Sequence, residues 1–295
     1  MLLGGHNHPV MTVFVYDASV GNVLHTLHEG NAVFGVTCLD SRLYMLRDKS
    51  SGQIEVYDTQ SYRLLQRLTV PRFSAMNDVV ACAHSRCLYI ADANKDCVHR
   101  VGLRIVWMSR PDVRQWPVHD VPAGLSVTDA HTLLVTCDEA RTVKEFGADG
   151  KLLRVLELPA DVRSPWQAVQ LGGGEFVVCH GRASDPDHRV CRVASDGGVV
   201  AASFGGSPGS GTRQVNVPAH MAVARNGFAY VVDHNNYRVV LLSPALNFIR
   251  VVASREQLKW KPQRLWLDAG KSRLYVAVNV KVGEFTAGRV VVIGV

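Results

Sequence analysis

Residues 218–239 decide the fold. Pro218-Ala-His-Met-Ala-Val223 leads through a turn into Tyr230-Val-Val-Asp233, and a polar loop leads on to Asn236-Tyr-Arg-Val239. The turn contains Asn226-Gly227, a pair that tolerates positive φ and is the strongest short signal for a two-stranded hairpin. The third apolar segment continues past Val239, and a fourth follows it before residue 254. This stretch therefore predicts four short, consecutive antiparallel strands.

The same pattern returns along the chain. The second segment of each unit carries an aromatic or apolar anchor, and the anchors are spaced by 45, 45, 42, 54 and 45 residues: Tyr44, Tyr89, Leu134, Phe176, Tyr230 and Tyr275. The long interval contains a glycine-rich insertion at residues 205–211. A repeat of about 45 residues is typical of the four-stranded blade of a β-propeller, and no long segment has helical periodicity. We therefore predict an all-β, six-bladed β-propeller of four-stranded blades.

The repeats indicate a single domain over residues 1–295. The units are expected at approximately 30–71, 72–118, 119–160, 161–214, 215–258 and 259–295, with N-terminal strands in residues 1–29. The last unit holds only three strand segments, so an N-terminal strand is predicted to complete the last blade and leave no open sheet edge. Residues 11–17 (MTVFVYD) and 288–295 (GRVVVIGV) compete for that place. Either one of them pairs outside the blade or the ring is irregular.

The composition excludes several classes of protein. Of the 295 residues, 47% are hydrophobic and 20% are charged, which is typical of a globular domain and not of a disordered chain. No apolar run approaches the roughly 20 residues of a membrane span, and no signal-peptide pattern is expected. The net charge of +6 permits an acidic partner without requiring one. The seven cysteines lie mostly in apolar runs, so reduced, buried thiols and a cytoplasmic location are expected.

The fifth unit resembles the NHL repeat, whose units run P-x-G-[IV]-A-V, then [IV]-Y-V-A-D, then x-x-N-x-R-[IV]. Asp233, Asn236 and Arg238 match the structural signature: the carboxylate accepts backbone N–H groups in the loop, and the guanidinium braces that loop. The second unit has Asp92 but Cys97 where the arginine would fall. The third is shorter, with Arg141 displaced, and the first, fourth and sixth lose most of the loop signature.

The resemblance implies binding of proteins or RNA on the faces of the propeller. NHL propellers occur at the C-termini of tripartite-motif ubiquitin ligases and in standalone proteins. This chain has no RING-type or B-box Cys/His clusters and no heptads, so it is not expected to act as a ligase. We expect a non-enzymatic, scaffold-like module that binds a protein or peptide, with single-stranded RNA as the alternative.

One position in each unit is expected to line the mouth of the central channel. Aligning the units on the P-x-G motif gives Gly35, Asp78, Gly124, Gln167, His220 and Arg264. The polar members, Asp78, Gln167, His220 and Arg264, are candidates for binding a small polar ligand or an acidic side chain of a partner. The alternative is that they form hydrogen bonds with one another and with ordered water.

The loops on one face combine basic and aromatic residues. This face is formed by the loops that precede the inner strands and by those between the second and third strands, and we name it the loop face. Its binding candidates are Arg72, Phe73, Arg163, Trp166, Arg182, Lys259, Trp260 and Lys261. Exposed Arg and aromatic residues suit stacked RNA bases and also suit a protein hot spot, unless the tryptophans pack between blades. The same loops carry Asp161, Asp185, Asp187 and Glu284, so we rank protein binding above RNA binding.

An enzymatic alternative is a metal-dependent lactonase or lyase of the propeller type. Such a site needs several Asp, Glu, Asn or His ligands around the axis. The predicted channel positions supply one Asp and one His, with Arg264 opposing a cation. The chain also lacks nucleophile-elbow, zinc-protease and phosphate-loop motifs. We therefore expect no catalysis, no metal and no cofactor.

Overall fold

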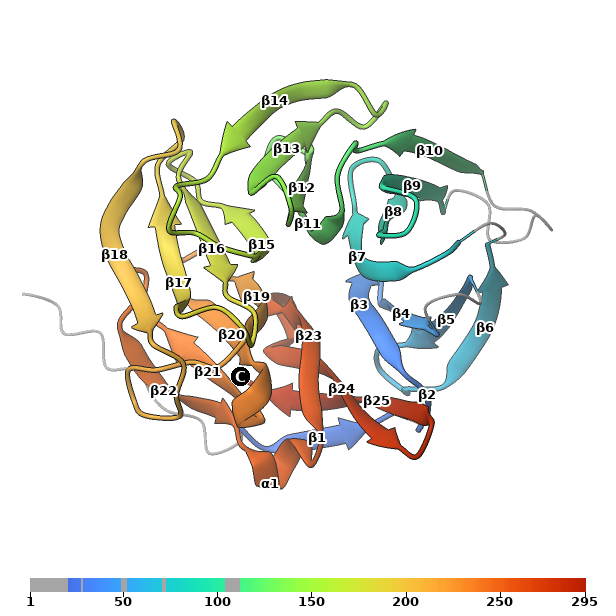
Figure 1. Ribbon diagram of the computed structural model, residues 1–295. Coiled ribbons are helices and arrows are strands. Elements are labelled where there is room, and N and C mark those ends of the chain that lie inside the picture. Colours follow the sequence, from blue (N-terminus) through green and yellow to red (C-terminus); the bar gives the residue numbers. More distant parts are fainter. Residues whose placement is uncertain (1–20, 28, 49–51, 71–72, 104–111) are drawn as a thin grey trace, which may run out of the picture.

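In the computed structural model, residues 21–27, 29–48, 52–70, 73–103 and 112–295 are described, and their strands form six sheets arranged in a ring (Figure 1). Each sheet is antiparallel and runs from an innermost strand beside the central axis to an outer strand at the rim. The fold is a six-bladed β-propeller, as the repeat predicted.

The strands of blades 1 to 3 follow one another along the chain. Blade 1 contains β3 (Val33–Leu39), β4 (Arg42–Arg47), β5 (Gln53–Asp58) and β6 (Leu64–Thr69). Blade 2 contains β7 (Met76–Cys82), β8 (Cys87–Asp92), β9 (Cys97–Gly102) and β10 (Val113–Pro117). Blade 3 contains β11 (Pro122–Val127), β12 (Leu133–Cys137), β13 (Thr142–Phe146) and β14 (Leu152–Glu157).

Blades 4 and 5 repeat this order, and blade 6 takes its outer strands from the beginning of the described chain. Blade 4 contains β15 (Pro165–Gln170), β16 (Phe176–His180), β17 (His188–Val193) and β18 (Val199–Gly206). Blade 5 contains β19 (Pro218–Val223), β20 (Ala229–Asp233), β21 (Arg238–Leu242) and β22 (Phe248–Ala253). Blade 6 contains β23 (Lys261–Asp268), β24 (Arg273–Val282), β25 (Phe285–Gly294) and β1 (Val23–Thr26), and the short β2 (Gly30–Asn31) also pairs with β25.

The ring closes in blade 6, as predicted. β1 pairs antiparallel with β25, so an N-terminal strand forms the fourth strand after three from the C-terminal unit. Two segments were expected to compete for the fourth position of this blade. One of them, residues 288–294, belongs to β25 and is therefore part of the third strand. The other segment, residues 11–17, lies outside the described residues. Hydrogen bonds from Gly21 N–H to the Gly294 carbonyl and from Leu27 N–H to the Val290 carbonyl extend the junction.

Burial follows the position of a strand in its blade. The second strands are covered on both faces by neighbouring blades, so β8 and β12 are buried along their whole length, and their sequences are largely continuous apolar runs. Outer strands such as β6 have mostly exposed side chains. The core is divided into clusters between adjacent blades; one of them joins Ile54 of blade 1 to Met76 and Leu88 of blade 2.

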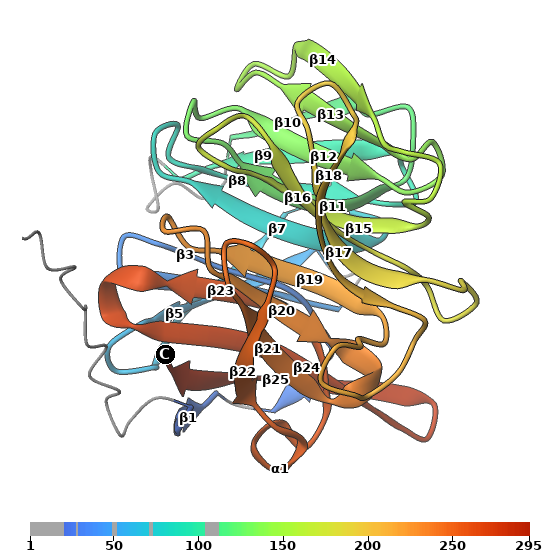
Figure 2. The same ribbon diagram turned by 90° about the vertical axis from the view of Figure 1, so that its left-hand side faces the viewer.

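Helix is confined to short segments within the described residues. α1 (Arg255–Leu258) lies at the edge of the molecule, outside the sheets, in both views (Figures 1 and 2). Two single turns, η1 (His234–Asn236) and η2 (Ala269–Lys271), connect strands. Across the part of the chain that is described, no helix is long and apolar enough to cross a membrane. All seven cysteines are free thiols, and six of them are buried.

Candidate functional site

The six predicted channel positions share one register at the propeller axis. Every inner strand has a bulge within its first three residues, and the residue that follows the bulge is Gly35, Asp78, Gly124, Gln167, His220 or Arg264. The two glycines are required by close approach. A Cβ atom on Gly124 would lie 2.3 Å from the Trp166 carbonyl oxygen, and one on Gly35 would lie 2.7 Å from Val79 Cγ1.

Asp78 is the centre of a buried ionic network at this level. Its Oδ1 lies 3.4 Å from Arg264 Nε, and its Oδ2 lies 3.5 Å from His220 Nε2. The same carboxylate accepts hydrogen bonds from the backbone N–H of Val79 at 2.9 Å and of Leu125 at 2.9 Å. Blades 2, 3, 5 and 6 therefore meet at one side chain.

Arg264 and Gln167 bind the main chain of neighbouring and opposite blades. The Arg264 guanidinium donates to the carbonyls of Asn77 (2.8 Å) and Ala123 (3.3 Å) across the axis, and to those of Gln263 and Ala219 beside it. Gln167 accepts from Met221 N–H at 2.7 Å and donates to the Leu125 carbonyl at 3.2 Å. The four polar residues hold the blades together, which is the alternative that the sequence left open. Ligand binding by these residues stays a prediction.

The protonation of this network follows from burial and charge. Burial raises the pKa of Asp78, but His220, Arg264 and the Leu125 N–H outweigh it, so the pKa lies below its ordinary value. Burial lowers the pKa of His220 in spite of the attraction of Asp78. Asp78 is therefore ionised and is balanced by the permanent charge of Arg264.

A cavity occupies the channel on the other side of this network. Its volume is about 450 Å³, and it extends toward the turns between first and second strands, the face opposite the loop face. Gln167 and His220 border it at the network end, and its walls include Val127, Val169, Trp266 and Leu267. Apolar residues three positions after the P-x-G position mark this wall in the sequence of three units, as Val127, Val223 and Leu267.

The predicted loop-face residues differ in their exposure. Arg163, Arg182 and Lys259 are exposed, and Trp166, Trp260 and Lys261 are partly buried. Arg72 lies outside the described residues. Phe73 is 8% exposed and packs in the core between blades 1 and 2, with its ring edge-on to His99 at 4.5 Å, so the expectation of an exposed aromatic is wrong there. The physical reason is that the loop before β7 places the Phe73 side chain against buried apolar residues of blades 1 and 2.

Aromatic rings on the loop face of blades 4 to 6 are paired with cations. Arg289 lies over Trp260 with its Cζ 4.3 Å from the ring centroid, and Arg182 lies 5.9 Å from Trp166. Tyr237 is contacted by Arg255 at 3.9 Å and by Lys261 at 5.7 Å. We name these seven residues the cation–aromatic patch. The tip of the β24–β25 hairpin also presents Phe285, which is 80% exposed.

The loop signature of the fifth unit has the predicted structural role. Asp233 accepts hydrogen bonds from Asn216 N–H (2.7 Å), Asn236 Nδ2 (2.8 Å) and Arg238 Nε (2.7 Å). Arg238 also donates to the carbonyls of the glycine-rich loop, including that of Gln214 at 2.9 Å. Burial raises the pKa of Asp233, and these donors oppose that rise.

Sequence reasoning missed two arginines that share the register of Arg238. Arg238 pairs with the last residue of the second strand, Asp233, and Arg189 pairs in the same way with His180. Arg289 pairs with Val278, opposite the start of the inner strand of blade 6. The fourth and sixth units thus keep the arginine but lack the aspartate, and an alignment anchored on Asp could not find them.

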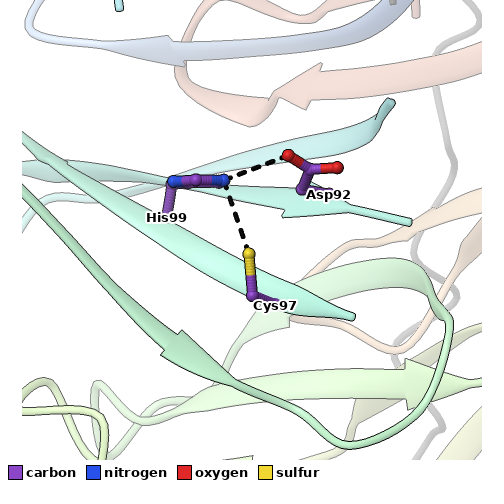
Figure 3. Close-up of side chains that lie close together, drawn as sticks. All are labelled: Asp92, Cys97 and His99. Atoms are coloured by element: carbon purple, nitrogen blue, oxygen red, sulfur yellow. Dashed lines mark hydrogen bonds and ion pairs between the residues drawn. The ribbon is translucent and has the colours of Figure 1, made fainter. Parts of the chain in front are cut away.

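One group of side chains has the composition of a metal site. Asp92, Cys97 and His99 are buried in blade 2, and their ligand atoms lie within 4.8 Å of one another (Figure 3). Burial raises the pKa of the Cys97 thiol to about 11 and lowers the pKa of His99. None of these three residues was expected to be a ligand from the sequence, because Cys97 stands in the position of the repeat's arginine.

Comparisons with solved structures agree with the fold. Virginiamycin B lyase from Staphylococcus aureus is similar with a TM-score of 0.59 and 10% identity, over 88% of this chain and 87% of that chain. Hydrazine synthase from Kuenenia stuttgartiensis has a TM-score of 0.60 and 12% identity, over 85% and 94%. The Cps50 (Swd1) β-propeller domain from Myceliophteria thermophila has a TM-score of 0.56 and 12% identity, over 89% and 82%. No family model matches the chain, and no curated protein matches it. At these identities the similarity establishes the propeller fold alone.

Proposed function

We propose that this propeller is a non-enzymatic, NHL-like interaction module that binds an acidic segment of a protein or peptide on its loop face. The observation that carries the proposal is the cation–aromatic patch. Three of its cations, Arg255, Lys261 and Arg289, lie beside aromatic rings and have no carboxylate partner among the described residues. Clustered Trp, Tyr and Arg side chains are the usual hot-spot residues of protein interfaces.

The placement of the patch favours a peptide over RNA. Bases bind single-stranded-RNA proteins by stacking on open aromatic faces. Here Arg289 lies over the ring of Trp260 and Arg255 lies over the ring of Tyr237, so these two faces are not open to a base. A partner would instead contact the guanidinium groups. Arg182 is already paired with Asp138, and Asp185 accepts its backbone N–H, which weakens the positive field. Separate cations suit separate carboxylates of an acidic peptide.

The axial network supports a binding role for the loop face and not for the channel mouth. Asp78, Gln167, His220 and Arg264 are buried and bind main-chain groups or one another. A ligand entering there would have to replace those bonds. The proposal includes the absence of catalysis. This part needs its own test, because a lyase is among the similar structures.

The test is selection of a displayed library of random 12-residue peptides on the purified protein. We expect enriched peptides to be rich in Asp and Glu, and their affinity to fall about 30-fold or more in Arg255→Ala/Arg289→Ala, since hot-spot truncations cost about 2 kcal/mol or more. Arg114→Ala, at an exposed arginine of β10 on the rim, is the matched control and should bind like the wild type. Equal binding by both variants would refute the proposal. Salt-dependent binding of oligouridine in place of acidic peptides would favour RNA.

A further inference from the structure

We propose that Asp92, Cys97 and His99 form a structural zinc site inside blade 2. The strand pairing places all three together. Asp92 ends β8 and lies directly opposite Cys97, the first residue of β9, and His99 follows two residues later on the same face of that strand. His99 Nε2 lies 3.2 Å from Asp92 Oδ2 and 3.5 Å from Cys97 Sγ, so one imidazole nitrogen faces both an oxygen and a sulfur (Figure 3).

These separations fit the edges of a zinc coordination tetrahedron. With Zn–S of about 2.3 Å and Zn–N and Zn–O of about 2.0–2.1 Å, a tetrahedral site has N–O edges of about 3.3 Å and N–S edges of about 3.6 Å. The separations of 3.2 Å and 3.5 Å agree with these edges. The donor set, a thiolate, an imidazole and a carboxylate, suits Zn²⁺ and does not suit Mg²⁺ or Ca²⁺, which prefer oxygen ligands.

The second observation is that the arginine opposite the buried aspartate in blade 5 is replaced in blade 2. In blade 5 the buried Asp233 is neutralised by Arg238, which stands opposite it in the strand pairing. In blade 2 that position holds Cys97, and the buried Asp92 accepts hydrogen bonds from the backbone N–H groups of Ser74 and Ala75 and lies beside the His99 ring. The charge of Lys95, in the loop between β8 and β9, acts on Cys97 and His99, but the position opposite Asp92 in the ladder holds no cation. A buried carboxylate is stabilised by a cation held directly against it. Zn²⁺ bound by the Asp92 carboxylate and the Cys97 thiolate would leave the site neutral.

The site would fix the end of the β8–β9 hairpin to the loop before β7. Asp92 already binds that loop through two backbone N–H groups, and Phe73 packs edge-on against the His99 ring. The three side chains are almost fully buried, so a metal bound there holds the blade together and is not exposed to a substrate.

The experiment uses full-length, tag-free protein incubated with Zn²⁺ and desalted, with metal measured by mass spectrometry. We expect about one zinc per chain in the wild type and in Cys137→Ala, which removes a buried thiol from the second strand of blade 3. Cys97→Ala should bind none. Replacing Zn²⁺ by Co²⁺ should give a thiolate charge-transfer band that is lost in Cys97→Ala and kept in Cys137→Ala.

A second variant separates loss of metal from loss of fold. Cys97→Arg recreates the Asp–Arg pair of blade 5, so it should keep the wild-type circular dichroism and lose the zinc. A wild type that retains no zinc after incubation, or a Cys97→Arg protein that retains it, overturns the proposal.

Discussion

Arg264 joins four blades through one side chain. Its guanidinium lies beside the Asp78 carboxylate and donates to carbonyls in blades 2, 3, 5 and 6. All of these groups are buried, so their interactions are little screened by solvent. Arg264 therefore connects the inner strands of these four blades at the axis.

Removing Arg264 should be strongly destabilising. We expect Arg264→Met to lower the free energy of unfolding by about 3–5 kcal/mol, because the Asp78 charge is left buried without its partner. Asp78→Asn/Arg264→Met should lose clearly less than the sum of the two single changes, since the double variant buries no unpaired charge. Urea denaturation of the four proteins measures this coupling. Additive losses would show that the two side chains act independently.

At the scale of the element, the closing strand β1 is held by its backbone, by one of its own rings and by one residue beyond its end. The side chains of β1 itself are exposed, whereas the adjacent Leu27 is only 2% exposed and packs in a cluster with Val290, Val292 and Tyr275. Closure of the ring therefore depends on β-ladder hydrogen bonds, on the packing of Leu27, and on the ring of His25, which stacks on Tyr62 with centroids 4.3 Å apart.

A pair of leucines tests this account of closure. Leu27→Ala should lower the free energy of unfolding by about 2–4 kcal/mol, because it leaves a cavity between blades 6 and 1. Leu24→Ala, at a β1 position that is 45% exposed, should cost less than about 0.5 kcal/mol. Thermal unfolding of both variants checks the difference. Similar losses would mean that β1 contributes through its exposed side chains.

At the scale of the whole molecule, buried histidines in several blades link stability to pH. Burial lowers the pKa of His220 and His234, and it lowers that of His180 to about 4, with Arg189 acting in the same direction. His180 donates through Nδ1 to the Arg163 carbonyl, and its Nε2 is buried without a hydrogen-bond partner. The folded protein therefore holds these rings in the neutral form.

The stability of the protein should fall as the solution is acidified below pH 6.5. An unfolded histidine binds its proton near pH 6.5, whereas folded His180 binds one only near pH 4, so stability is complete above 6.5 and is lost progressively between these values. This residue alone accounts for about 3 kcal/mol. His180→Gln keeps a donor for Arg163 and removes the titration, so its stability should change less with pH. Parallel pH profiles for both proteins would contradict the assignment.

The repeat in the sequence was enough to determine the architecture. A period near 45 residues and the Asn226-Gly227 turn predicted the blades, and the alignment on P-x-G placed Asp78, Gln167, His220 and Arg264 in one register. These features are local: strand length, alternation and turn chemistry are encoded within each unit. Phe73 shows the limit of such reasoning, since exposure depends on what the neighbouring blade covers.

What only the tertiary structure decided is which residues from different blades meet. The bonds of Arg264 across the axis, the cations over Trp260 and Tyr237, and the equivalence of Arg189 and Arg289 with Arg238 all depend on packing or strand register. The same holds for the grouping of Asp92, Cys97 and His99: the sequence showed that the arginine of the repeat is missing, but not that His99 lies beside the aspartate. A single sequence determines the period of its strands because that period is a local property, whereas the partners of a side chain are set by contacts between segments far apart in the chain.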